Sequence, residues 1–175
     1  MNEVLKAIKE RRSIRKYKKE IPTDEEIRTI VDAGLQAPSG KNMQAGIVLV
    51  VKDPEIREMF VRANRRIGGF SEDVDPFYGA PVLLVVLEPK GGRNSKYDGA
   101  LMMENMMLAA YSIGLGSIWI NRAFEEFEEE EFQELLRKHG IEKDYEGVGH
   151  CAIGYIDGDL PAAPPIRDDR VFYID

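Results

Sequence analysis

The chain has 175 residues, with 24 Lys or Arg against 31 Asp or Glu, which gives a formal net charge of −7. This length fits one domain over residues 1–175, and the acidic charge argues against a nucleic acid or an anionic membrane as a partner. One cysteine, two histidines and no apolar run of membrane-spanning length exclude an internal disulfide and argue against a metal site, so we expect a soluble cytoplasmic protein.

The N-terminal part of the chain predicts two helices. Residues 2–11 carry apolar side chains on one side and predict a short helix. Thr23 and Glu26 have the spacing of a capping box, and apolar residues then recur at helical intervals. Pro38 ends this second helix.

A strand, a helix and a second strand follow. Residues 45–52 are apolar and rich in β-branched side chains, which predicts a buried strand. Asp53 and Pro54 are residue types favoured at the N-cap and first position of a helix. That helix leads to a glycine-rich loop at 67–79, before a buried strand at 81–88.

The second half of the chain contains an unusually apolar helix. Residues 98–113 are apolar almost all round, so this helix must be buried in the core or against another subunit. We expect Asp98 to be its N-cap. A short strand at 117–120, a helix at 124–138 and a strand at 148–156 follow.

The chain ends in an extended tail over 158–175, proline-rich at first, in which 171–174 have the composition of a terminal strand. We expect Cys151, in an apolar run, to be a buried small residue and not a nucleophile. Helices and strands mix without a regular βαβ rhythm, and no G-x-G-x-x-G motif follows a strand. The pattern therefore favours an α+β fold, with a sheet flanked by helices, over a dinucleotide-binding fold.

The first of two ligand-binding candidates is a basic segment after the first helix. Its polar members are Arg11, Arg12, Ser13 and Arg15. A charge run at a helix end is commonly solvated. Here Ile14 and Tyr17 interleave apolar anchors with the charges, which suits a segment packed on one side and facing an anion on the other.

The second candidate is a turn whose notable residues are Pro38, Ser39, Gly40, Asn42 and Gln44. These are mostly ordinary turn formers, and a helix-ending turn is one interpretation. A turn does not require the two amides, which suit a ring edge with donors and acceptors. Together the two segments fit a ligand with an anionic tail and a flat polar ring, such as a nucleotide or a flavin.

The motifs R-R-S-I-R-K-Y and A-P-S-G-K-N-M-Q resemble those of the nitroreductase family of FMN-dependent oxidoreductases. The resemblance implies a central mixed, mostly antiparallel sheet flanked by helices, and a homodimer with two FMN sites at its interface. The helix at 98–113, with its four methionines, is then a candidate dimer face. The tail at 158–175 is a candidate to reach the partner subunit.

The resemblance also implies roles for individual residues. Arg11, Ser13 and Arg15 match residues that contact the FMN phosphate, ribityl chain and pyrimidine edge, while the turn that contains Asn42 and Gln44 approaches the flavin of the partner subunit. The glycine-rich step into the short strand matches a segment whose backbone faces the flavin. Its candidate residues are Trp119, Ile120 and Asn121.

Arg167 matches a basic residue that binds the phosphate. The roles of Asn64, Arg65 and Arg170 stay open. No side chain is expected to act as a nucleophile, acid or base, and Arg15 is expected to stabilise the reduced flavin electrostatically.

The implied reaction passes a hydride from NADH or NADPH through FMN to a small-molecule acceptor such as a nitroaromatic or a quinone. Alternatives on the same scaffold are a dehalogenase, an ene-reductase, and a flavin carrier or redox sensor without turnover. A nucleotide-binding regulatory module without flavin is a further alternative.

Overall fold

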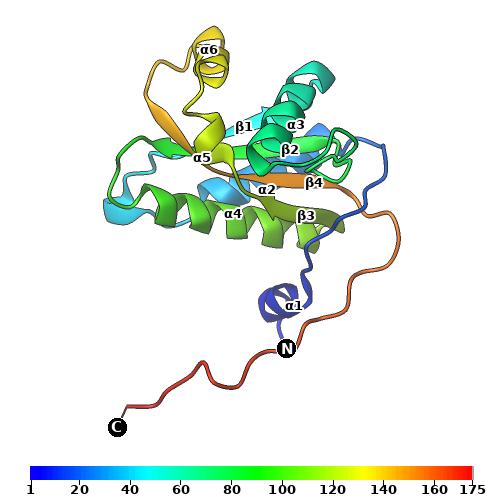
Figure 1. The fold of residues 1–175 in the computed structure, drawn as a ribbon. Helices are drawn as coiled ribbons and strands as arrows, with labels where there is room; N and C mark the ends of the chain where they lie inside the picture. Colours follow the sequence, from blue (N-terminus) through cyan, green and yellow to red (C-terminus); the bar gives the residue numbers. More distant parts are fainter. Residues whose placement is uncertain (175) are drawn as a thin grey trace.

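The computed structural model describes residues 1–174 as a three-layer arrangement around one antiparallel sheet (Figure 1). The strands are β1 (Ile47–Val51), β2 (Val82–Pro89), β3 (Leu115–Ile120) and β4 (Tyr145–Tyr155), in the order β1-β2-β4-β3. No helix in this part of the chain has the length and apolar character needed to span a membrane.

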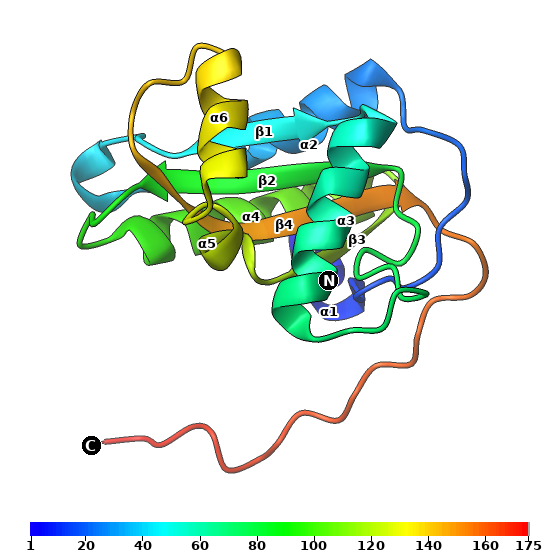
Figure 2. The same cartoon turned by 45° about the horizontal axis from the view of Figure 1, so that its top comes forward.

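Helices cover both faces of the sheet, as Figure 2 shows from a second direction. On one face lie α2 (Asp24–Leu35) and α4 (Ser95–Ser112), and on the other lie α3 (Pro54–Gly68), α5 (Ala123–Glu126) and α6 (Glu130–Lys138). Helix α1 (Glu3–Glu10) lies near the C-terminal part of α4, and Glu10 accepts a hydrogen bond from Tyr111 at 2.7 Å.

The central strand β2 contributes to both cores, which explains its continuous apolar sequence. Leu83, Val85 and Leu87 face α3, α5 and α6, while the alternate residues face α2 and α4. Almost all of these side chains are fully buried. A strand buried on both faces shows no polar alternation, so its length and β-branched composition were the useful signals.

Several sequence predictions are confirmed. Thr23 and Glu26 form the capping box of α2, since the Thr23 hydroxyl accepts from the Glu26 amide at 3.2 Å and the Glu26 carboxylate accepts from the Thr23 amide at 2.8 Å. Asp53 caps α3, and Pro54 occupies its first position. The expected α+β fold and the three long strands are also present.

The beginning of α4 differs from the prediction. The helix starts at Ser95 after Asn94, so Asp98 is not its N-cap. The carboxylate of Asp98 instead accepts from the Gly40 amide at 3.0 Å, in a contact 58 residues away in sequence. Local spacing cannot indicate a partner so distant along the chain.

The methionines of α4 were expected at a dimer face, and the structure places them inside the protomer. These side chains pack against α2 and the sheet; they are Met102, Met103, Met106 and Met107. An all-round apolar helix is therefore buried here mainly by its own chain.

Three further predictions of secondary structure are also corrected. The helix predicted at 124–138 is divided into α5 and α6, and the loop predicted from residue 67 begins after α3 ends at Gly68. Residues 171–174 lie in an exposed extended tail and form no strand within the described chain. The four strands pair only antiparallel; parallel pairing occurs at an isolated bridge between Ser13 and Ser117.

Candidate functional site

The basic segment after α1 runs along the outer edge of β3. The Ile14 amide donates to the Ser117 carbonyl at 3.0 Å, and Ser13 forms the parallel bridge to the same residue. Ile14 and Tyr17 are buried, whereas Arg15 between them is exposed. The structure therefore anchors the segment through its apolar residues, as the interleaved pattern predicted.

Four buried polar atoms in the basic segment and in β3 have no hydrogen-bond partner within the described residues. They are Arg11 Nη1, Arg12 Nε, Ser117 Oγ and Trp119 Nε1. A buried donor left without a partner destabilises the fold by about 1–3 kcal/mol, so four together require an explanation. Trp119 Nε1 lies over Gly149 of β4, in the core under α4. A ligand rich in acceptor oxygens would satisfy the donors of Arg11, Arg12 and Ser117.

The end of β3 forms part of a cavity of about 240 Å³. Its lining includes Trp119, Ile120, Asn121, Arg122, Tyr78 and Phe70. The Arg15 guanidinium lies 6.0 Å from the centroid of the Tyr78 ring. The basic segment and the predicted residues of β3 therefore meet at one edge of the sheet.

The turn after α2 lies elsewhere. It is fixed by the Gly40–Asp98 contact, by the Gln44 amide donating to Ser39 Oγ at 2.9 Å, and by the Gln44 side chain donating to Asn42 Oδ1 at 2.9 Å. Lys41, Asn42 and Gln44 all have positive φ angles, between 46° and 56°. Such backbone strain is concentrated at functional sites.

Within one protomer the two predicted segments do not meet. The turn packs against Asp98 near the start of α4, and α1 contacts Tyr111 near its end. Thirteen residues separate these positions, so the helix spacing puts them about 20 Å apart. Figure 1 shows the turn and α1 at opposite ends of α4.

Arg167 lies in the exposed tail and donates to Asp169 at 3.1 Å, away from both segments. Arg65 donates to the Val74 carbonyl at 2.9 Å, and Arg170 is exposed. The structure of one protomer does not bring Arg167 to the site.

A buried network supports the end of β3. His150 and Glu126 are both fully buried, and His150 Nε2 lies 2.6 Å from Glu126 Oε2. His150 Nδ1 donates to the Ile120 carbonyl at 3.1 Å, because a carbonyl can only accept. Asn64, also fully buried, donates to Glu126 at 3.1 Å and to the Asn121 carbonyl at 2.9 Å. Asn64 is therefore a structural residue.

Sequence reasoning did not identify Arg122, the second residue after β3. Its φ of 80° is left-handed, a conformation that costs a non-glycine residue about 1–2 kcal/mol. Its Nη1 donates to Asn64 Oδ1 at 3.3 Å. The one signal in the sequence was an arginine two residues after a strand, because the local sequence shows neither its backbone conformation nor its contact with Asn64.

Glu88 was also missed. Its side chain is 3% exposed and lines a cavity of about 180 Å³ together with Ser39, Gln44 and Asp98. Burial, together with the nearby charges of Asp98 and Glu146, raises the pKa of Glu88 to about 7. The signal in the sequence was a single acidic residue at the end of an otherwise apolar strand.

Cys151 is completely buried, and burial raises the pKa of its thiol to about 12. A thiol that stays protonated is a poor nucleophile, in agreement with the packing role predicted for it. No group of three or more His, Cys, Asp or Glu residues in the described part of the chain is arranged to hold a metal ion.

Comparison with known proteins gives consistent similarities. The profile of the nitroreductase family matches residues 8–155. A putative NADH dehydrogenase/NAD(P)H nitroreductase of Archaeoglobus fulgidus is 33% identical over 162 residues, covering 89% of this chain and 86% of the relative. An iodotyrosine deiodinase of Thermotoga neapolitana is 30% identical over 128 residues, covering 63% of this chain and 69% of the relative.

Among solved structures, a nitroreductase with bound FMN from Bacteroides fragilis superposes with a TM-score of 0.89, at 29% identity, over 100% of both chains. The fold expected from the sequence, a sheet flanked by helices in the arrangement of this family, is confirmed.

Proposed function

The chain belongs to the nitroreductase family, and from that premise we propose that it is an FMN-dependent oxidoreductase that reduces a small acceptor, such as a nitroaromatic or a quinone, with NADH or NADPH. The redox chemistry would be supplied by FMN, which can take a hydride from the nicotinamide donor and give reducing equivalents to the acceptor. The task of the protein is to bind and orient these molecules and to adjust the electrostatics around the flavin.

The observation that carries this proposal is the set of unpartnered buried atoms beside β3. Arg11 and Arg12 supply cationic donors there, and Ser117 supplies a neutral one. A phosphate and a ribityl chain offer the acceptors that these groups lack, and arginine suits phosphate because its planar fork carries a fixed charge. Ser13 belongs to the same segment and is proposed to contribute to the site.

Arg15 is proposed to act on the flavin ring and not on the phosphate. Its exposed guanidinium lies 6.0 Å from the ring centroid of Tyr78, and Tyr78 lines the cavity to which Trp119, Ile120 and Asn121 also belong. A fixed positive charge at this position would stabilise the anionic reduced flavin electrostatically, without transferring a proton.

We further propose that the complete site requires two copies of the chain. Because about 20 Å separates the two predicted segments along α4, the residues of the turn would serve a flavin held mainly by the other protomer. Those residues are Pro38, Ser39, Gly40, Asn42 and Gln44. Arg167 would reach the partner's site through the extended tail.

The surface of the protomer supports a homodimer. Val4, Leu5 and Ile8 on α1 are each at least half exposed and form an apolar stripe. They lie beside a shallow cavity lined partly by α4 residues such as Leu108. Exposed apolar patches of this kind are typical of interaction surfaces.

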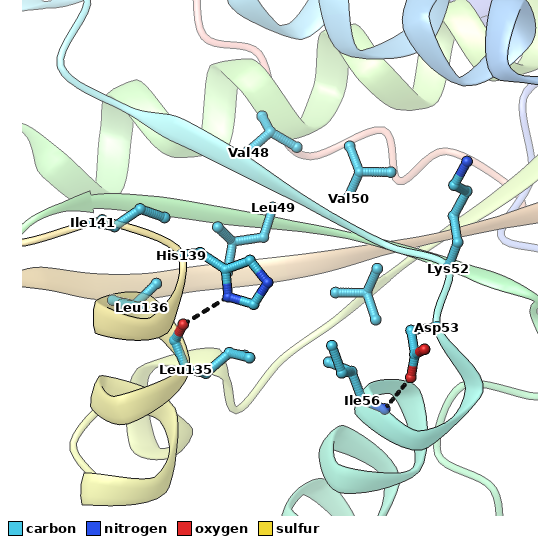
Figure 3. Close-up of a pocket in the computed structure, with 11 residues that line it drawn as sticks. Val48, Leu49, Val50, Lys52, Asp53, Ile56, Leu135, Leu136, His139 and Ile141 are labelled. Carbon is cyan, nitrogen blue, oxygen red and sulfur yellow. Dashed lines mark hydrogen bonds between the residues drawn. The ribbon is translucent and has the colours of Figure 1, made fainter.

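The outer edge of β1 offers a second contact for the partner. Within residues 1–174, strand β1 pairs only with β2. Beside it a cavity of about 250 Å³ extends to Ile56, Leu135 and Ile141 (Figure 3). The tail residues at 171–174 are apolar and strongly exposed. We propose that the partner's tail adds to β1 as a strand, because an unpaired edge supplies the necessary hydrogen-bond groups.

Dehalogenation is the second candidate activity, because the chain resembles an iodotyrosine deiodinase over 128 residues. The two activities differ in the acceptor and share the flavin site. Assays with a nitroaromatic, a quinone and a halogenated tyrosine, using the same reduced protein, therefore separate them.

An absorption spectrum recorded with and without NADH under anaerobic conditions tests the proposed function. The protein, purified and incubated with FMN, should be yellow, and NADH or NADPH should bleach the flavin band. Arg11→Ala should retain less FMN, whereas Arg93→Ala, at an exposed loop position before α4, should retain as much as the parent protein. Protein that takes up no FMN would contradict the proposal, and stable flavin without bleaching would indicate a carrier.

A further inference from the structure

Arg122 is a cation without an acidic partner at the mouth of the cavity beside β3. It is partly buried, and no carboxylate within residues 1–174 lies within 4.0 Å of its guanidinium. The neighbouring acids are engaged elsewhere. Asp75 pairs with Arg57 at 2.6 Å, and Glu126 binds His150 and Asn64.

The fold holds this cation in a defined position. The buried network fixes Ile120, Asn121 and Glu126 around Arg122, and Asn64 Oδ1 accepts directly from its guanidinium. Arg122 also lies over the ring of Phe70, with its Cζ 4.9 Å from the ring centroid. An arginine held by hydrogen bonding and stacking loses little entropy when it binds a ligand.

A glycine provides the space for this arrangement. A Cβ atom built at Gly68 would lie 2.8 Å from Arg122 Nε, so any larger residue would displace the guanidinium or the Phe70 ring. The backbone at Arg122 is left-handed, which directs the chain into α5 while the side chain lines the cavity. Strain retained at a pocket residue points to a binding role.

The cavity that Arg122 lines is the one shared with the proposed flavin site. Its lining includes Trp119, Ile120 and Asn121, and Tyr78 connects it to Arg15. The lining also includes Asp75, whose carboxylate is paired with Arg57. The charge left for a ligand is therefore that of Arg122, among aromatic and apolar side chains, which suits a small aromatic molecule with one anionic group.

We propose that Arg122 binds an anionic group, a carboxylate or a phosphate, of the molecule that exchanges electrons at this site. The inference rests on the proposed function, which supplies the site and its redox partners. The anion has two possible sources, the electron acceptor and the nicotinamide donor. In either case Arg122 sets the preference for charged over neutral ligands.

The test uses the full chain as purified, with its flavin content recorded. Trp119 is the only tryptophan and lines the cavity, so its fluorescence reports ligand binding without turnover. The probes are para-nitrobenzoate and para-nitrobenzyl alcohol, which have similar shapes but differ in charge. The variants are Arg122→Gln and Arg122→Lys. The control is Arg66→Gln, which removes an exposed arginine that pairs with Glu129.

We expect the parent protein and Arg66→Gln to bind the nitrobenzoate about tenfold more tightly than the alcohol, because the alcohol lacks the carboxylate that makes the charge-assisted contact with Arg122. This preference should disappear in Arg122→Gln and be partly retained in Arg122→Lys, which keeps the charge but not the planar fork. Steady-state assays with NADH and NADPH form the second arm. A selective rise in KM for the phosphate-richer donor in Arg122→Gln would identify the donor as the source of the anion.

Equal changes for the charged and neutral probes, with no change in donor preference, would overturn the proposal. Flavin content and NADH-dependent bleaching test the proposed function independently of this titration. If the proposed function is wrong, the protein would lack flavin or NADH-dependent bleaching, while the fluorescence titration would still measure whether Arg122 binds an anion.

Discussion

Replacement of Glu88 by glutamine should stabilise the protein at alkaline pH and have little effect at acidic pH. The carboxyl group lies opposite Glu146 in the β2–β4 register, and Asp98 approaches it from α4. Its side chain is nearly fully buried, and no hydrogen bond to it is present within the described residues. Ionisation therefore places an unpaired charge beside two other acids.

The magnitude follows from the change in pKa on folding. Burial, with the charges of Asp98 and Glu146, raises the pKa of Glu88 from 4.5 to about 7. At 1.36 kcal/mol for each pKa unit, this difference corresponds to about 3 kcal/mol. Between these two values the native chain holds a proton that the unfolded chain has released. The free energy of unfolding therefore falls as the pH rises from 4.5 to about 7, and the penalty is fully present above that range.

Urea unfolding of the parent protein and of Glu88→Gln, at about pH 4.5 and about pH 8, measures this effect. The variant should gain up to about 3 kcal/mol relative to the parent at the higher pH and close to nothing at the lower pH. Glu72→Gln, at an exposed loop position, should show no such difference between the two pH values.

A gain of equal size at both pH values would refute the reasoning, because it would mean that the protonation of Glu88 does not change between them. Since Glu88 lines the same cavity as Ser39 and Gln44, the reasoning also predicts tighter FMN binding by the variant at alkaline pH. Fluorescence quenching of FMN measures that linkage.

Four further predictions concern the proposed flavin site. The protein should bind FMN more tightly than FAD, and Arg11→Ala should weaken FMN by about 1.5–3 kcal/mol; flavin titrations measure both, and equal or tighter binding of FAD would contradict the first. Arg15→Ala should lower the flavin midpoint potential, because the reduced anion loses its nearby cation. An unchanged potential in spectroelectrochemistry would mean that Arg15 does not lie beside the flavin ring. Mixed dimers of Arg11→Ala and Gln44→Ala chains should recover one good FMN site of two, measured as flavin stoichiometry, and recovery of none would place both residues in the same chain's pocket.

Local chemistry made much of the fold predictable. The capping box at Thr23 and the Asp53–Pro54 start of α3 depend on neighbours within three residues, so the sequence contains all the necessary information. The role of Asp98 depends on Gly40, and the break between α5 and α6 falls in an acidic run without glycine or proline. Tertiary packing decides both, and single-sequence patterns do not contain it.

The candidate site divides in the same way. Arg11 and Gln44 stand in compact motifs that can be recognised without a structure. Arg122 depends on a left-handed backbone and on Asn64, which lies 58 residues earlier, and Glu88 depends on two acids from other elements. Sequence reasoning therefore identified the segments that carry recognisable residue types, and the structure adds the residues defined by their surroundings.

The exposed edge of β1 has a consequence for aggregation of the protein after proteolysis. If the partner's tail covers this edge, removal of one protomer's tail by a protease leaves the β1 edge of its partner with unpaired backbone donors and acceptors beside the cavity at Ile56, Leu135 and Ile141. Such an edge accepts any extended chain, including another damaged copy. Loss of a few C-terminal residues would then not only reduce activity. It would also expose the β1 edge that the tail covers, and this edge could start aggregation.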